Sequence, residues 1–358
     1  MEPRKYAYID SLRGVAILAV MMVHVGQMSF LYQISNGIKS QIIIDGQLGV
    51  QLFFLVSAYT LMRSIQSRQQ EPHAKRNFFI RRFFRIAPMY YIAILYYTFQ
   101  NFIGFNFFST GNISHSVPFI KLFANLFFIQ GFYPTIINSY VPGGWSISIE
   151  TTFYLVLPLL FTKIKTINHS LLFFIGSLLL ATGFQTLLIK TTIFGHGDFV
   201  NFNFINQLPM FSLGILAYFF LKKDAHHLHP ALLILLSGVL LFYNYFSPPY
   251  YLVYGIAWFF LLVGLSKLPI KILVNKPIEW IGKMSFSLYL IHFATIYWIE
   301  QWIPSSIFHI THFSNAILLF CGYYLLTLLS STSIAYLTYR FIEVPFQHYG
   351  KRLITKMK

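Results

Sequence analysis

The sequence predicts an all-α integral membrane protein with about ten membrane-spanning helices and both termini on the cytoplasmic side. Of its 358 residues, 56% are hydrophobic and only 10% are charged, whereas a soluble domain has about 25% charged residues. Apolar runs close to the roughly 20 residues needed to cross a bilayer recur along the whole chain. The distribution of basic residues between successive loops orients these runs.

Ten apolar runs are candidate spans. They lie at 12–31, 47–63, 84–103, 147–162, 170–189, 205–221, 231–246, 250–266, 284–302 and 315–338. The first run follows Arg4 and Lys5 as a signal peptide would, but it carries a histidine and lacks a small-residue cleavage site, so we expect it to be retained. A shorter run at 119–132 is predicted to be an interfacial or re-entrant segment. We expect residues 1–358 to form one membrane domain with a basic C-terminal tail at 339–358.

Basic residues test the number of spans independently. If the loops alternate between the two sides, one side carries 23 of the 26 lysines and arginines, and the other keeps only Lys39, Lys121 and Lys190. The positive-inside rule makes the basic side cytoplasmic. An eleventh span through 119–132 would invert every later loop, so the charges favour ten. Membrane topology thus explains the net charge of +16, and we expect no nucleic-acid partner.

Two polar residues of the first span are unusual in an apolar helix. Arg13 and His24 are 11 residues apart, which places them on one helix face about 16 Å apart along the axis. A snorkelling anchor explains Arg13 equally well, and a helix-packing histidine explains His24. A desolvated neutral imidazole can also act as a general base, and a cation at the membrane surface can bind an anion. Together they predict a substrate whose charged end stays at the surface while its reactive end reaches inward.

The segment "IRRFFRIAPMYY" places arginines at the cytoplasmic start of the third span. Arg82 and Arg85 lie on one face at i, i+3 spacing, with Arg81 beside them. Guanidinium groups suit phosphate oxygens. Lipid headgroups are an alternative partner, but the cluster together with Arg13 favours a phosphate-bearing ligand.

Two further spans carry polar residues where a membrane helix would not need them. Glu150 lies about one turn into the fourth span from its exterior end, with Ser146 on the same face, and an acid in a span indicates a functional site or a rim carboxylate. Ser285, Tyr289 and His292 form a polar stripe on the ninth span. His292 lies about 13 Å along that span, close to the expected depth of His24. It is a catalytic-pocket residue or an interhelical hydrogen-bond partner.

The C-terminal segment "YRFIEVPFQHYGKR" is predicted to be a structural clasp on the cytoplasmic side. Arg340 and Glu343 can pair at i, i+3 spacing. We expect Pro345 to stop the helix directly after them.

These motifs, in this order, resemble the acyltransferase-3 family of bacterial membrane O-acyltransferases over almost the whole chain. The matching segments are R-x10-H from Arg13 to His24, "FFLVSAYTL" with Ser57 and Tyr59, R-x-x-R at Arg82 and Arg85, W-S-x-S-x-E from Trp145 to Glu150, "SFSLYLIH" at 285–292, and the F-I-E-x-P tail. Two positions depart from the family pattern. Ala58 replaces the usual glycine, so we expect the second span to approach its neighbour less closely, and Thr151 replaces a second acid, so a paired-carboxylate scheme is in doubt.

The resemblance implies an enzyme that moves an acyl group, commonly acetyl from cytoplasmic acyl-CoA, to a hydroxyl of a cell-envelope polysaccharide or glycolipid. It implies that His24 and Glu150 are catalytic, Glu150 on the acceptor side, and that Arg13, Arg82 and Arg85 hold the CoA phosphates. The candidates for the substrate pocket are Ser57, Tyr59, Trp145, Ser146, Ser285, Tyr289 and His292. Acyl-CoA is then a donor substrate, and we expect no metal and no tightly bound cofactor.

The expected location is the bacterial cytoplasmic membrane, with membrane lipids as further partners. Direct transfer and an acyl-enzyme intermediate both need a neutral imidazole, so both stay open. A multi-span transporter or flippase of a glycan precursor is the main alternative, but the sequence has no inverted-repeat signal. The acceptor, its hydroxyl, the acyl chain and the oligomeric state stay open.

Overall fold

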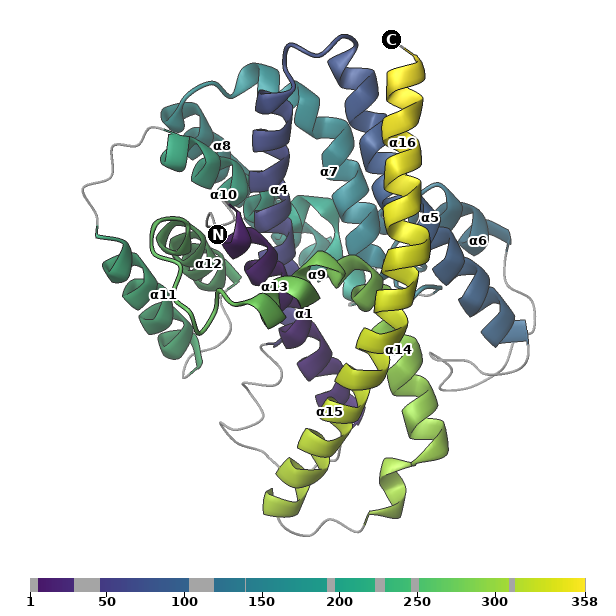
Figure 1. The fold of residues 1–358 in the computed structure, drawn as a ribbon. Coiled ribbons are helices and arrows are strands. Elements are labelled where there is room, and N and C mark those ends of the chain that lie inside the picture. Colours follow the sequence, from purple (N-terminus) through teal and green to yellow (C-terminus); the bar gives the residue numbers. More distant parts are fainter. Residues whose placement is uncertain are drawn as a thin grey trace. The chain divides into compact units, whose positions relative to one another are not determined.

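The computed structural model describes residues 6–28, 46–102, 119–138, 140–191, 197–222, 229–245, 251–308 and 313–357 (Figure 1). Over these residues every regular element is a helix, which confirms the predicted all-α class. The ends of four predicted spans, at 29–31, 103, 246 and 250, lie outside the described residues, as do the basic residues Arg4, Lys5, Lys39, Lys223 and Lys358.

Fourteen α-helices are present among the described residues. They are α1 (Ala7–Met28), α4 (Gly49–Ser67), α5 (Ala74–Phe102), α6 (Phe119–Leu126), α7 (Gly144–Lys163), α8 (Ile167–Thr191), α9 (Asp198–Phe202), α10 (Phe204–Lys222), α11 (Pro230–Tyr245), α12 (Tyr251–Lys267), α13 (Lys276–Lys283), α14 (Ser285–Trp302), α15 (Phe313–Thr338) and α16 (Val344–Lys356). Short turns η1 (Gly46–Leu48), η2 (Gln130–Phe132) and η3 (Ser305–Ile307) have 3-10 geometry, and η4 (Tyr339–Glu343) is a π-helical turn.

Each of the ten predicted spans coincides with a helix. Six helical stretches among the described residues are long and apolar enough to cross a membrane: Ala7–Gln27, Gly46–Ser67, Gly144–Lys163, Ile167–Thr191, Asp198–Lys222 and Ser314–Lys356. Helices α11 and α12 are apolar but shorter, with 16 and 17 residues. Helices α5 and α14 are not among these six stretches. The chain is therefore a multi-span membrane protein, while ten spans and their orientation stay predictions.

The segment predicted to be interfacial or re-entrant is a short helix followed by a turn. Helix α6 has only eight residues, whereas a helical span needs about 20. Phe128 adopts a left-handed conformation with φ of 59° after the helix and reverses the chain into η2. The segment is therefore too short to cross a bilayer as a helix.

The chain divides into two compact units. The first unit comprises Met1–Tyr59 and Leu213–Leu337, and the second comprises Thr60–Ser212 and Thr338–Lys358. Each unit is described by itself below. The single membrane domain expected from the sequence stays a prediction.

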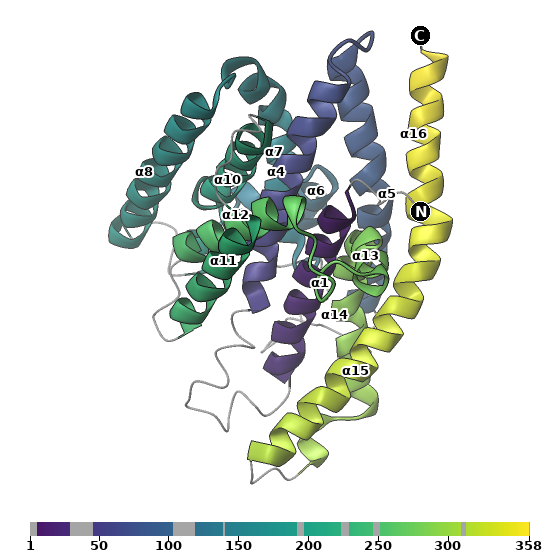
Figure 2. The ribbon, with the colours of Figure 1, turned by 60° about the vertical axis from the view of Figure 1, so that its left-hand side comes forward.

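In the first unit, glycines allow other elements to approach helix α1 closely. Gly282 of α13 lies against the backbone carbonyl of Asp10, and Gly14 of α1 lies against that of Ile278. A side chain at either glycine would displace backbone atoms, because a Cβ atom has no room there. These contacts fix α13 across the first half of α1, beside the segment that carries Arg13 (Figure 2).

The expected looser packing at Ala58 is not what the structure shows. Ala58 is fully buried, and its Cβ atom together with the Leu55 carbonyl lies close to Gly214 of helix α10. The facing helix therefore supplies the glycine that α4 lacks, and the two helices pack closely at this point.

In the second unit, α16 packs against α5 with the two helices antiparallel (Figures 1 and 2). The Arg76 guanidinium at the start of α5 donates to the Met357 carbonyl at 3.3 Å. Farther along α5, the Phe84 ring meets the Tyr349 ring at a centroid distance of 5.3 Å, and Gly350 packs directly on Phe84. This packing holds the C-terminal tail against the arginine-bearing half of α5.

The expectation that Pro345 stops the helix is wrong. The helical stretch Ser314–Lys356 continues through it for 43 residues, and Pro345 lies in the first turn of α16, directly after the π-helical turn η4. A proline donates no backbone hydrogen bond and clashes with the preceding turn, and the wider π turn accommodates it.

Candidate active site

Two histidines, one on α1 and one on α14, lie together in the first unit. The ring centroids of His24 and His292 are 5.4 Å apart. The Phe293 ring lies 4.4 Å from His24 and 4.1 Å from His292. His292 is completely buried, whereas His24 is partly exposed. The similar depth inferred for the two histidines from their sequence positions is therefore confirmed.

The hydrogen bonds of His292 define which of its ring nitrogens carries a proton. Nδ1 lies 3.2 Å from the Leu288 carbonyl oxygen. A carbonyl oxygen can only accept, so Nδ1 is the donor and the neutral ring keeps a lone pair on Nε2. This buried Nε2 has no hydrogen-bond partner among the described residues. It is therefore placed to accept a proton or a hydrogen bond from a bound molecule.

The Nδ1 atom of His24 also faces an oxygen, which belongs to a side chain and not to a backbone carbonyl. Its Nδ1 lies 3.2 Å from Oε1 of Gln27, one turn farther along α1. With this amide oxygen as the acceptor, the proton is on Nδ1 and Nε2 has the lone pair. The structure therefore holds two neighbouring imidazoles in the tautomer that leaves Nε2 basic.

Of the other predicted pocket residues of the first unit, Tyr289 lies beside this pair, and the others are buried. Tyr289 lies 5.7 Å from His292, and its edge meets Phe53 at 6.4 Å, as centroid distances. Ser57 and Ser285 are buried. Tyr59, also buried, shares a hydrogen bond of 2.8 Å with the hydroxyl of Tyr8.

Arg13 has an acidic neighbour that the motif analysis did not include. Its guanidinium lies 3.6 Å from the carboxylate of Asp10 on the preceding turn of α1, and both side chains are about 30% exposed. The pair is accessible to solvent, which weakens it. Arg13 can therefore exchange this partner for an anionic ligand at low cost.

In the second unit, Arg85 is bound by a carboxylate that the sequence did not assign to it. Its guanidinium forms a salt bridge with Glu343, whose side chain is completely buried. The Gln347 amide also donates to Glu343, at 3.2 Å. The predicted clasp thus reaches from the C-terminal tail to α5, through a pair of residues 258 positions apart.

Arg82 lies between two aromatic rings. Its guanidinium carbon is 5.9 Å from the ring centroids of both Phe78 and Tyr154, and its Nε is buried without a hydrogen-bond partner among the described residues. The Tyr154 hydroxyl donates to Glu150 at 2.7 Å. Glu150 is also within electrostatic range of Arg82 and Arg85, so it belongs to the arginine cluster.

The remaining residues of the W-S-x-S-x-E motif contact neighbouring segments of the second unit. The Trp145 ring stacks on Phe202 at 4.2 Å, with an interplanar angle of 11°. The Ser146 hydroxyl donates to the Gly143 carbonyl at 2.9 Å, at the start of α7. The Ser148 hydroxyl accepts from the Gly131 backbone N–H at 3.0 Å and donates to a carbonyl of the turn before η2. The motif therefore anchors the segment between α6 and α7.

Sequence reasoning missed four residues that the structure adds to these clusters. They are Gln27 and Phe293 beside the histidines, and Tyr154 and Glu343 beside the arginines. Helical spacing could have identified two of them, since Gln27 follows His24 at i+3 and Tyr154 follows Glu150 at i+4. Phe293 and the long-range contact of Glu343 have no such signal.

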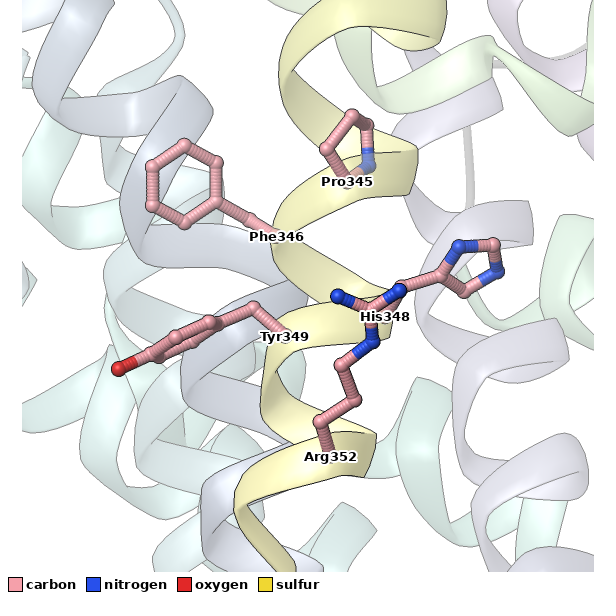
Figure 3. Close-up of a pocket in the computed structure, with 5 residues that line it drawn as sticks. All are labelled: Pro345, Phe346, His348, Tyr349 and Arg352. Carbon is pink, nitrogen blue, oxygen red and sulfur yellow. The ribbon is translucent and has the colours of Figure 1, made fainter.

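A shallow hollow of about 420 Å³ along α16 is not a second site. It is lined by Pro345, Phe346, His348, Tyr349 and Arg352. Figure 3 shows the rings of Phe346 and Tyr349 on one side of the helix and the His348 ring on the other. These side chains do not converge on a common point, so the hollow does not present a set of groups for one ligand.

Comparison with known sequences identifies the family. A family model described as an acyltransferase domain matches residues 6–336 of the chain. The chain belongs to the acyltransferase-3 family. This confirms the resemblance inferred from the ordered motifs.

Curated relatives match almost the whole of this chain over part of their own length. The O-acetyltransferases OatA of Staphylococcus aureus strains NCTC 8325 and COL are each 25% identical to this acyltransferase-3 chain over 412 residues, a match that covers 98% of this chain. The chain spans 58% of the length of these relatives. No solved structure matches it significantly.

Proposed function

We propose that this acyltransferase-3 protein is a membrane O-acetyltransferase, which moves an acetyl group from cytoplasmic acyl-CoA to a hydroxyl of a cell-envelope polysaccharide or glycolipid. Family membership and the names of the relatives support acyl transfer to oxygen. The observation that carries the proposal is the His24–His292 pair, in which the neighbouring imidazoles both keep a lone pair on Nε2.

In the proposed reaction, His24 acts as the general base. Its Nε2 takes the proton of the acceptor hydroxyl as the oxygen attacks the thioester carbonyl. The tetrahedral intermediate then expels the CoA thiolate, and the His24 imidazolium gives the proton to this thiolate. The products are the O-acetyl ester and free CoA. Gln27 holds the ring of His24 in the required tautomer. The Nε2 atom of His292 accepts a hydrogen bond from the bound substrate.

The arginine cluster of the second unit is proposed to bind the phosphates of the donor. Arg82 is the stronger candidate, because its Nε has no hydrogen-bond partner among the described residues. Arg85 already neutralises Glu343, so we assign to it the orientation of the cluster. Arg13, on the first unit, is proposed separately as a cation for an anionic group of the donor.

The proposed topology has ten spans and cytoplasmic termini, in the bacterial cytoplasmic membrane. It puts the basic loops on the side where acyl-CoA is available. Glu150, predicted to serve the acceptor side, lies with the arginine cluster. We therefore propose that its negative charge partly balances the arginines of the donor site, and that its hydrogen bond from Tyr154 holds it there.

Acetyl transfer by the purified protein tests the proposal. Reconstituted protein receives radiolabelled acetyl-CoA and a glycolipid extract, and the label is followed into base-labile esters. We expect incorporation that depends on both substrates. Binding or movement of the glycolipid without any use of acetyl-CoA would contradict the enzyme and favour a transporter.

A further inference from the structure

A small cavity lies at one end of the second unit, beside the arginine cluster. It has a volume of about 190 Å³ and is formed by the end of α4, the first two turns of α5 and the end of α7. Its lining combines apolar with basic and polar side chains: Ile65, Ala74, Phe78, Pro158 and Phe161 with Ser64, Arg68, Gln69, Lys75, Arg81, Thr162 and Lys165.

The charge of this cavity is strongly positive. Four basic residues line it, and none of the lining residues is acidic. Arg81 is already held by the Glu71 carboxylate through two hydrogen bonds of 3.2 and 3.0 Å. Among the described residues, the Lys165 ammonium donates to the Phe161 carbonyl, at 2.9 Å, and the Arg68 guanidinium donates to Ser64, and neither forms a salt bridge there. Lys75 forms no salt bridge among the described residues, so three cations are available to an anion.

One aromatic residue connects the cavity to the arginine cluster. Phe78 lines the cavity, and the guanidinium of Arg82 lies 5.9 Å from its ring centroid. The Phe78 ring also meets the Tyr154 ring edge-to-face at 6.4 Å. A ligand with one anionic group at Arg82 and another in the cavity would therefore extend past Phe78.

We propose that this cavity binds the adenosine 3′-phosphate end of the acyl-CoA donor, with the 3′-phosphate among Arg68, Lys75 and Lys165. The inference rests on the proposed function. The cavity is smaller than the about 300–1,000 Å³ of a pocket for a complete ligand of drug size, so it accommodates one end of a long ligand. Its apolar lining residues suit a nucleobase, its basic lining residues suit a phosphate, and Arg82 next to Phe78 offers a cation to a second phosphate group.

Donors with and without the 3′-phosphate test this proposal. The KM of the reconstituted protein is measured for acetyl-CoA and for acetyl-3′-dephospho-CoA, in the wild type and in Lys75→Gln combined with Lys165→Gln. In the wild type we expect loss of the 3′-phosphate to raise KM about tenfold, equivalent to about 1.4 kcal/mol, with kcat unchanged. The double variant should have a similarly raised KM for acetyl-CoA and no preference between the donors.

Lys163→Gln is the matched control, because Lys163 is an exposed lysine at the same end of α7 that does not line the cavity. It should keep the wild-type preference. Equal KM values for the two donors in the wild type would overturn the cavity assignment and leave the proposed function intact. A KM that follows the anionic lipid content of the vesicles, and not the 3′-phosphate, would overturn it in favour of a lipid headgroup. Failure of the wild type to use any acyl-CoA would overturn the proposed function itself.

Discussion

The salt bridge between Arg85 and Glu343 should contribute more to stability than any surface ion pair of this protein. Glu343 is completely buried, while the Arg85 side chain is 26% exposed. Removing one partner of a buried pair costs about 3–5 kcal/mol, because the other charge is left in a low-dielectric environment. The partial exposure of Arg85 places the expected cost of Glu343→Leu at the lower end, about 3 kcal/mol.

A double-mutant cycle isolates this interaction from the packing of α16. Arg85→Met alone removes this cation from the buried Glu343 carboxylate and should destabilise the protein by a similar amount. The double variant removes both charges and should be more stable than either single variant, with a coupling energy of about 2–3 kcal/mol. Unfolding by denaturant in detergent micelles, followed by the loss of helical circular dichroism, measures these differences.

The result that would refute this reasoning is additivity. If the double variant loses the sum of the two single losses, the charges do not stabilise each other. If Glu343→Leu costs less than about 1 kcal/mol, the carboxylate is not held in a buried pair, and the packing of the tail on α5 must depend on the Phe84 and Tyr349 contacts.

Three other substitutions test the site and the packing around it. His292→Gln removes the buried Nε2 acceptor and should lower kcat about 100-fold with an unchanged KM for acetyl-CoA; an unchanged kcat would limit His292 to packing. Gln27→Ala removes one hydrogen bond to His24 and should lower kcat about fivefold, the equivalent of about 1 kcal/mol, whereas a drop as large as that of a His24 variant would mean more than orientation. Gly282→Ala should destabilise the protein by about 1–3 kcal/mol, because its Cβ atom would meet the Asp10 carbonyl; wild-type stability in the same unfolding assay would show that α13 can move away from α1.

Local spacing explains what the sequence predicted well. His24 and His292 are 268 positions apart, yet the number of residues from the end of each span gave both a similar depth, and their rings lie 5.4 Å apart. The helical rise makes depth a simple function of position. Which helices are neighbours does not follow from that rise, so the partner histidine was assigned only as one of two alternatives.

Contacts between distant segments account for what the sequence could not predict. The local spacing offers Glu343 a cation three positions away in Arg340, but it gives no sign of the salt bridge that Glu343 forms with Arg85 of another helix. The alanine at position 58 suggested a looser contact, but Gly214 on the facing helix restores the space. In both cases the contacting residue, Arg85 or Gly214, lies on another helix, and the position of that helix depends on the whole fold.

The proposed role of His24 as the general base of acetyl transfer is tested most directly by a labelled-transfer assay on three reconstituted proteins. The wild type is compared with His24→Ala and with His169→Ala, a control that removes an exposed histidine of α8. Binding of acetyl-CoA is measured separately by equilibrium dialysis. We predict that all three proteins bind acetyl-CoA, and that only His24→Ala fails to move the label to the acceptor. Transfer by His24→Ala at the wild-type rate would contradict the account.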